Sequence, residues 1–217
     1  MLTRFSLFVF AVVLISLSTS LAQAQSPSKP RVELKTSLGT IVLELDRAAA
    51  PKTVDNFLEY VRSGHYDGTV FHRVIKDFMA QGGGYDRDLK AKPTRAPIVN
   101  EGEQAEKAGL KNDRGTIAMA RTADPHSATA QFFINFKDNA FLNHSAAQAQ
   151  IPPPCKVPNP VPGCARFGWG YTAFGRVVSG MDVVDKMAEI PTGAGGPFPT
   201  DVPKTPIVIE RATILTP

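Results

Sequence analysis

The segment Phe71–Gln81 brings together residue types that could act as one site. Arg73 stays protonated and carries several hydrogen-bond donors in one plane, and Phe78, Met79 and Gln81 follow it. Apolar side chains hold apolar ligands, and a fixed cation polarises a weakly basic atom placed beside it. The segment therefore suggests a site that holds an apolar group and polarises a weakly basic atom.

A second segment, Ala130–Ile134, has the composition of a strand. Gln131 and Phe133 are two positions apart, so they project from the same face of that strand. Neither this segment nor the first one contains a serine or a cysteine, the usual nucleophiles. The chemistry that we expect is therefore non-covalent.

The beginning of the chain has the pattern of an export signal. Arg4 precedes the apolar run Phe5–Leu17, and Ala22-Gln23-Ala24 then offers small residues at the spacing that a signal peptidase cuts. We expect residues 1–24 to be removed and the exported chain to begin at Gln25. The alternative is an uncleaved membrane anchor, because the apolar run and its flank could nearly span a bilayer. The Ala-x-Ala motif and the polar residues after it favour cleavage.

The composition bounds the number of domains and the kinds of partner. After removal of the signal, the chain is long enough for one hydrophobic core and short for two, so we expect a short linker (25–31) and one domain (32–217). The formal net charge is +4, but the basic residues are scattered among acidic ones. We therefore expect no nucleic-acid partner, and no membrane association after signal cleavage.

The two cysteines, Cys155 and Cys164, both follow the signal. In an oxidising compartment such a close pair favours a disulfide, and closing a loop of about ten residues would stabilise the fold by roughly 2–3 kcal/mol. A zinc site would need two more ligands, and His126 and His144 are not arranged to supply them. We expect no metal and no cofactor.

Hydrophobic periodicity predicts a mainly β fold. Apolar residues alternate with polar ones on either side of Ser37-Leu38-Gly39, as in a hairpin with one buried face. Helical spacing is found only between Pro51 and Gly64 and between Gly180 and Pro191. Short strands are expected at 69–75, 78–81, 116–120, 131–135, 172–178 and 207–215. This pattern favours a closed antiparallel barrel of about eight strands, capped by two α-helices.

Four strings stand in the order and spacing of cyclophilin-type peptidyl-prolyl cis-trans isomerases: FHRVIKDFMAQGG, GTIAMA, AQFFI and FGRVVSGMDVVDK. The resemblance covers roughly Val32 to Leu215. GTIAMARTADPHSATAQFFIN, with Arg121 after Met119-Ala120, looks most like the exported bacterial branch, which implies a bacterial periplasmic location. The resemblance also implies an eight-stranded barrel capped by two helices, in agreement with the periodicity.

The resemblance implies an enzyme that accelerates rotation about Xaa-Pro bonds in exported proteins during folding, without a cofactor. The alternative is a chaperone on the same fold, which would bind proline peptides with little or no turnover. The expected partners are unfolded, proline-containing polypeptides, and the expected state is a monomer. Arg73 is the implied catalytic residue. The implied substrate-binding residues are Phe78, Met79, Gln81, Ala120, Arg121, Gln131, Phe133, Phe141, Leu142 and Tyr171.

The chain departs from the familiar family pattern in two ways. Phe141 stands where many eukaryotic members carry tryptophan, and because cyclosporin uses the indole of that tryptophan as a hydrogen-bonding partner, we expect weak cyclosporin binding. Tyr171 stands where those members carry histidine, and we expect it to help shape the pocket. The second departure is a proline- and cysteine-rich insertion at about 146–168. Because it joins Leu142 to Tyr171, it could narrow access to the pocket or offer one of its own Xaa-Pro bonds, or it could be a passive surface loop.

Overall fold

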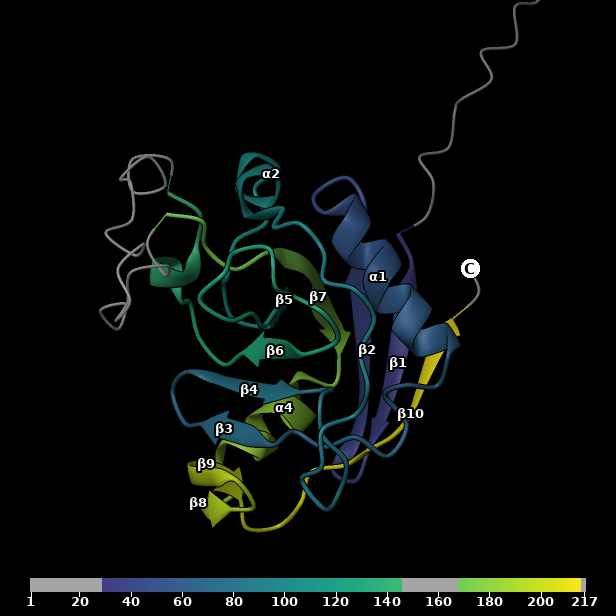
Figure 1. Ribbon diagram of the computed structural model, residues 1–217, viewed down its shortest axis with the longest axis vertical. Helices are drawn as coiled ribbons and strands as arrows, with labels where there is room; N and C mark the ends of the chain where they lie inside the picture. The colour runs from purple at the N-terminus through teal and green to yellow at the C-terminus, as the bar shows by residue number, and fades with distance from the viewer. Residues whose placement is uncertain (1–28, 146–167, 216–217) are drawn as a thin grey trace, which may run out of the picture.

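The computed structural model describes residues 29–145 and 168–215 (Figure 1). The expected signal peptide, the two cysteines and nearly all of the expected insertion lie outside the described residues. Cleavage before Gln25 and the Cys155–Cys164 disulfide therefore stay predictions. In the described part of the chain, no helix is long and apolar enough to cross a membrane.

One antiparallel sheet of eight strands forms the body of the protein, and its strands lie side by side in the order β10-β1-β2-β7-β5-β6-β4-β3. Their bounds are β1 Arg31–Thr36, β2 Gly39–Leu45, β3 Arg73–Ile75, β4 Met79–Gly82, β5 Thr116–Met119, β6 Phe132–Asn135, β7 Ala173–Ser179 and β10 Ile209–Leu215. All of these strands were predicted from the sequence. A separate hairpin, β8 (Thr192–Gly195) and β9 (Phe198–Pro203), was not predicted, and it lies beside β3 (Figure 1).

The prediction of a closed barrel is wrong, because the sheet curls into a half-barrel whose end strands, β3 and β10, do not pair. Hydrogen bonds between the two ends of the sheet join residues 68–71, just before β3, only to residues 207–209, at the start of β10. The amide N–H of Phe71 donates to the carbonyl of Ile207 at 2.9 Å, and that of Ile209 donates to Thr69 at 2.8 Å. β3 is only three residues long, and the β8–β9 hairpin lies next to it. These features leave no room for a full ladder between the two ends.

Both predicted helices are present, as α1 (Pro51–Arg62) and α4 (Met181–Ala188). Each packs its apolar side chains into the core on the concave side of the sheet. A third short helix, α2 (Gly102–Lys107), and a 3-10 turn, η1 (Ala140–Leu142), were not predicted. Each is too short to show a helical repeat of apolar residues.

Two hydrophobic clusters lie on opposite faces of the sheet. Phe132 packs edge-on against Phe57 of α1 in the inner core, with ring centroids 5.5 Å apart. The next residue, Phe133, points the other way, because successive side chains of a strand alternate between faces. Phe133 joins a smaller outer cluster with Met79, Ala118 and Leu142, among others. This outer face carries the candidate site.

Candidate active site

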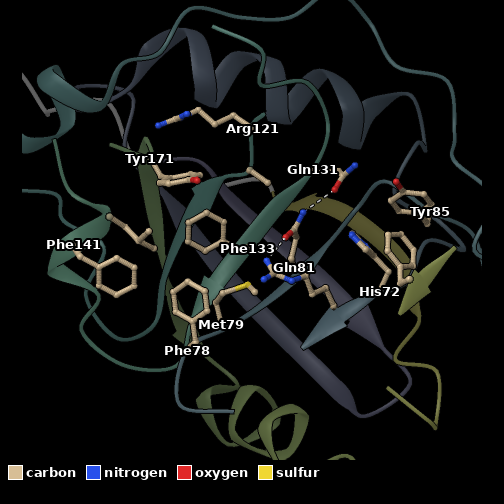
Figure 2. A pocket seen from close by; sticks show the side chains of 14 residues that line it. His72, Phe78, Met79, Gln81, Tyr85, Arg121, Gln131, Phe133, Phe141 and Tyr171 are labelled. Atoms are coloured by element: carbon tan, nitrogen blue, oxygen red, sulfur yellow. Dashed lines mark hydrogen bonds between the residues drawn. The ribbon is translucent and has the colours of Figure 1, made fainter. Parts of the chain in front are cut away.

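One row of residues runs straight across four strands on the outer face. Arg73 of β3 pairs with Gln81 of β4, which pairs with Phe133 of β6, which pairs with Ala118 of β5. Residues in direct register share a face of the sheet, and neighbouring strands are about 4.8 Å apart. The register therefore brings a cation, an amide and an aromatic ring together in one place. Figure 2 shows Gln81 and Phe133 next to each other.

These side chains line a pocket of about 590 Å³ (Figure 2). The structure brings all of the expected site residues to this pocket: Arg73, Phe78, Met79, Gln81, Ala120, Arg121, Gln131, Phe133, Phe141, Leu142 and Tyr171. Three further residues, His72, Tyr85 and Phe198, line it as well. The roles assigned to the expected residues stay predictions, because placement alone does not test a role.

The apolar part of the pocket has a buried floor and an exposed rim. Met79 and Phe133 are buried in the floor. Phe141 is 72 % exposed and stacks on Phe78, with ring centroids 5.6 Å apart. Tyr171 meets Phe133 edge-on at 5.7 Å. A small aliphatic ring fits such a site, since it can pack against aromatic faces while one side stays open to solvent.

The polar part of the pocket is a chain of hydrogen bonds that starts at Arg73. Nη1 of Arg73 donates to Oε1 of Gln81 at 3.4 Å, and Nε2 of Gln81 donates to Oε1 of Gln131 at 2.9 Å. Nε of Arg73 lies 3.6 Å from Oδ2 of Asp201, a residue of β9. The side chain of Arg73 is still 42 % exposed, so a ligand can reach the guanidinium group.

A glycine makes room for Gln131. A Cβ atom at Gly84 would lie 2.5 Å from Cγ of Gln131 and 2.6 Å from Nε2, which is closer than real Cβ contacts come. Glycine at this position therefore lets the backbone after β4 pass in close contact with the side chain of Gln131. Any larger residue at Gly84 would push the amide of Gln131 away from Gln81.

Arg121 is held against the aromatic rim. Its guanidinium group lies over the ring of Tyr171, 4.5 Å from the centroid. Nε of Arg121 donates to the carbonyl of Gly170 at 3.0 Å, and Nη1 donates to that of Thr122 at 2.9 Å. Arg121 thus borders the pocket, as expected, and stiffens the segment that carries Tyr171.

His72 is buried, with only 3 % exposed, although its neighbour Arg73 is partly open to solvent. Burial lowers the pKa of His72 to about 4, and the charge of Arg73 acts in the same direction, against a hydrogen bond that the ring donates to the backbone of Val70. The ring is therefore neutral at neutral pH. It packs against Tyr85 and Phe198, with ring centroids 4.6 Å and 5.3 Å away.

A network of buried asparagines supports the pocket from behind. Nδ2 of Asn112 donates to the carbonyls of Leu142 and Tyr171, at 3.2 Å and 3.0 Å. Nδ2 of Asn139 donates to the carbonyl of Phe78 at 3.0 Å and to Oδ1 of Asn135 at 2.8 Å. Three segments that line the pocket are thus joined through side-chain amides. The sequence reasoning missed these asparagines, because a polar residue gives no periodic signal when it is buried.

Within residues 29–145 and 168–215, no group of three or more His, Cys, Asp or Glu side chains is placed to hold a metal ion. Among the residues that line the pocket there is also no serine, threonine or cysteine. A curled antiparallel sheet that carries an arginine, a glutamine pair and an apolar pocket on its outer face fits a site that binds a peptide and polarises one of its amide groups.

Comparison with known proteins makes the assignment specific. Residues 31–214 match the family model described as cyclophilin type peptidyl-prolyl cis-trans isomerase/CLD. The chain therefore belongs to the cyclophilin-type peptidyl-prolyl cis-trans isomerase family, and it is an isomerase of Xaa-Pro peptide bonds.

The relatives include three bacterial peptidyl-prolyl cis-trans isomerases. The chain is 59 % identical to isomerase cyp18 of Streptomyces antibioticus, over 85 % of this chain and 98 % of the relative. It is 49 % identical to isomerase B of Escherichia coli, over 84 % of this chain and 98 % of the relative. It is 44 % identical to isomerase A of Dickeya dadantii, over 94 % of each chain.

Solved structures support the fold. A cyclophilin-type isomerase from Cryptosporidium parvum matches with a TM-score of 0.59 and 22 % identity, over 87 % of this chain and 99 % of that one. A second structure of the same protein, determined in the presence of the dipeptide Ala-Pro, matches with a TM-score of 0.58 and 22 % identity, over 86 % and 99 %.

Proposed function

We propose that this isomerase accelerates the folding of exported proteins by rotating their Xaa-Pro bonds, with Arg73 as the catalytic residue. The barrier to rotation is about 18–20 kcal/mol, because resonance gives the amide partial double-bond character. As the bond twists, the prolyl nitrogen becomes pyramidal and gains a lone pair. A fixed donor beside that nitrogen stabilises the twisted state more than either planar state.

The observation that carries this proposal is the register of Arg73, Gln81 and Phe133 across three strands. When a prolyl ring packs against Phe133 and Met79, the amide bond before the proline lies next to β4 and β3. The guanidinium group of Arg73 lies there. Gln81 accepts a hydrogen bond from Arg73, so the orientation of the cation is set before substrate arrives. Arginine takes no part in proton transfer, so the chemical step needs no titrating group.

Gln81 and Gln131 are proposed to bind the main chain of the substrate. Their amides already bond to each other at 2.9 Å, and each keeps further donor or acceptor positions for a peptide. The Cryptosporidium structure determined with Ala-Pro supports a proline-containing ligand. Among the residues that line the pocket, Arg73 and Arg121 carry the only permanent charges, which suits a neutral peptide segment.

The export of the enzyme rests on its N-terminal sequence pattern, and the periplasmic location rests on the resemblance of GTIAMARTADPHSATAQFFIN to the exported bacterial branch. We propose that the mature chain begins at Gln25, carries a Cys155–Cys164 disulfide and is a monomer. Mass spectrometry of the protein released from the periplasm tests the first two points. An intact N-terminus, or alkylation of both cysteines without prior reduction, contradicts them. Size-exclusion chromatography with light scattering tests the third.

Weak cyclosporin binding is proposed from Phe141, which offers no indole N–H at the rim of the pocket. The exposed ring can be replaced without disturbing the core. Phe141→Trp should therefore raise the affinity for cyclosporin, measured by fluorescence titration, while the parent binds weakly. Nanomolar binding by the parent would refute this proposal.

The role of Arg73 is tested by an isomerisation assay on a short proline peptide. Arg73→Ala should abolish most of the activity, and Arg73→Lys should also lose most of it, because an ammonium group lacks the planar fork of donors. Arg211, an exposed arginine on β10, supplies the matched control Arg211→Ala, which should keep the parental rate. If Arg73→Ala isomerises the peptide as fast as the parent, Arg73 is not the catalytic residue. If neither protein accelerates isomerisation above the uncatalysed rate while both bind denatured protein, the chaperone is the better interpretation.

A further inference from the structure

The pocket extends well beyond the place proposed for the proline. Phe78, Phe133 and Phe141 lie at one end of it (Figure 2). His72 and Tyr85 lie at the other end, with Gln81 in between (Figure 2). A volume of about 590 Å³ falls in the range of sites that enclose a drug-sized molecule, whereas the proline ring adds only three methylene groups to the backbone.

The second end is built from three rings. The centroids of His72 and Tyr85 are 4.6 Å apart, those of His72 and Phe198 5.3 Å, and those of Tyr85 and Phe198 5.1 Å. Tyr85 and Phe198 meet edge-on, at 87°. Both rings are only partly buried, so part of their surface faces the pocket. A further aromatic ring can add to this cluster at the same spacing, since aromatic pairs favour centroid distances of about 4.5–7 Å.

The charges around this end suit an uncharged side chain. His72 is neutral at neutral pH, because burial lowers its pKa to about 4. Of the two permanent charges that line the pocket, Arg73 directly follows His72 in the chain, and Asp201 lies 3.6 Å from its Nε. An aromatic ring of the substrate beside Arg73 would be favourable, because the face of an aromatic ring attracts a cation. Arg73 would disfavour a second cation from a lysine or an arginine of the substrate.

The spacing of the strands sets the distance to the proline. From β6, which carries Phe133, to β3, which follows His72, there are two inter-strand steps of about 4.8 Å each. Two residues of extended peptide span roughly 7 Å, and the side chain covers the remaining distance. Residues two positions apart also point to the same side of an extended peptide.

We propose that His72, Tyr85 and Phe198 form a second subsite, which binds an aromatic side chain located two residues from the proline of the substrate. This inference rests on the proposed function, because it assumes that the prolyl ring sits against Phe133. Phe198 belongs to the β8–β9 hairpin, so the hairpin forms one wall of this subsite and contributes to the choice of substrate.

The test compares proline peptides that carry phenylalanine or alanine two residues before, or two residues after, the proline. With the parent enzyme, kcat/KM should be roughly five- to tenfold higher for the phenylalanine peptide in one of the two series. Phe198→Ala and Tyr85→Ala should each reduce this ratio to near one. Val178, an apolar side chain on β7 that is 43 % exposed and outside the pocket, supplies the control Val178→Ala, which should keep the parental ratio.

The outcomes separate the subsite from the proposed function. If the parent isomerises neither peptide, the proposed function fails. If it isomerises both at the same rate in both series, or if Phe198→Ala keeps the parental ratio, the subsite is refuted while the isomerase stands. Because the readout is a ratio for one preparation of each variant, partial unfolding of a variant does not alter it. Phe198→Leu provides a second check, since a smaller apolar wall should give an intermediate ratio.

Discussion

Asp201 of β9 lies beside Arg73 of β3, with its Oδ2 atom 3.6 Å from Nε of the guanidinium group. Asp201 has a φ of 68°, in the left-handed region that residues other than glycine seldom adopt. The hairpin thus holds this carboxylate in an uncommon backbone conformation, at the side of the guanidinium that is not used by Gln81. Two partners on different strands then fix the direction of the cation.

Asp201→Asn should lower kcat about three- to tenfold and change the melting temperature little. The ion pair is 42 % and 32 % exposed, so solvent screens it, and such pairs contribute only about 0–1 kcal/mol to stability. Catalysis depends more steeply on the position of the cation, because small misplacements of a reacting group are costly. Asp201→Glu should restore part of the rate. An unchanged kcat for Asp201→Asn would show that Gln81 alone positions Arg73.

The pKa of His72 predicts an acid-sensitive fold. In the unfolded chain the imidazole titrates near its ordinary pKa of about 6.5, but in the folded protein burial lowers this pKa to about 4. Between these values the unfolded state binds more protons, so the free energy of unfolding decreases as the pH falls from about 6.5 to 4. The full difference is at most about 3 kcal/mol.

The measurement is urea unfolding of the parent and of His72→Phe across this range of pH. The variant cannot take up the proton, so its stability should fall less steeply below pH 6.5. His65 also has a lowered pKa, because it is partly buried, and it contributes a slope in both proteins. The difference between the two curves therefore reports His72. Parallel curves would contradict the assignment.

The sequence could predict the parts of the site that lie on strands with alternating apolar residues, or within the family-like strings FHRVIKDFMAQGG and AQFFI. Gln81 and Gln131 could be predicted because they lie on the predicted strands 78–81 and 131–135. Phe198 and Asp201 were missed, since TGAGGPFPTDVP is rich in glycine and proline and does not alternate. The open edge of the sheet could not be predicted either. Periodicity shows which face of a strand is buried, but it does not show whether the two end strands of the sheet pair with each other.

The side chain of Glu101, about fifty residues away in sequence, caps the N-terminus of α1. The carboxylate is 7 % exposed and accepts hydrogen bonds from the backbone N–H groups of Lys52 and Thr53, at 3.1 Å and 2.8 Å. Ala50, the residue before the helix, has no side chain that could cap it. Glu101→Ala should therefore lower the free energy of unfolding by about 1–3 kcal/mol, since buried donors would lose their acceptor.

Chemical denaturation checks the effect of Glu101→Ala. The control is Glu103→Ala, which removes an exposed carboxylate paired with Lys107 one turn away and should cost less than about 0.5 kcal/mol. The activity per folded molecule should stay at the parental value in both variants, because neither carboxylate lines the pocket. Equal stability of the two variants would mean that other groups cap α1.

Asn112 links the η1 turn to the segment of Tyr171 through one amide group. Asn112→Ala should leave the carbonyls of Leu142 and Tyr171 without their buried donor and cost about 1–3 kcal/mol of stability. Because these two segments carry one wall of the pocket, the wall should loosen and KM should rise about three- to tenfold, with a smaller change in kcat. Thr122→Ala is the matched control, since it removes an exposed polar side chain outside the network. A rise in KM for both variants, or a fall in kcat alone for Asn112→Ala, would contradict a role of Asn112 in shaping the pocket.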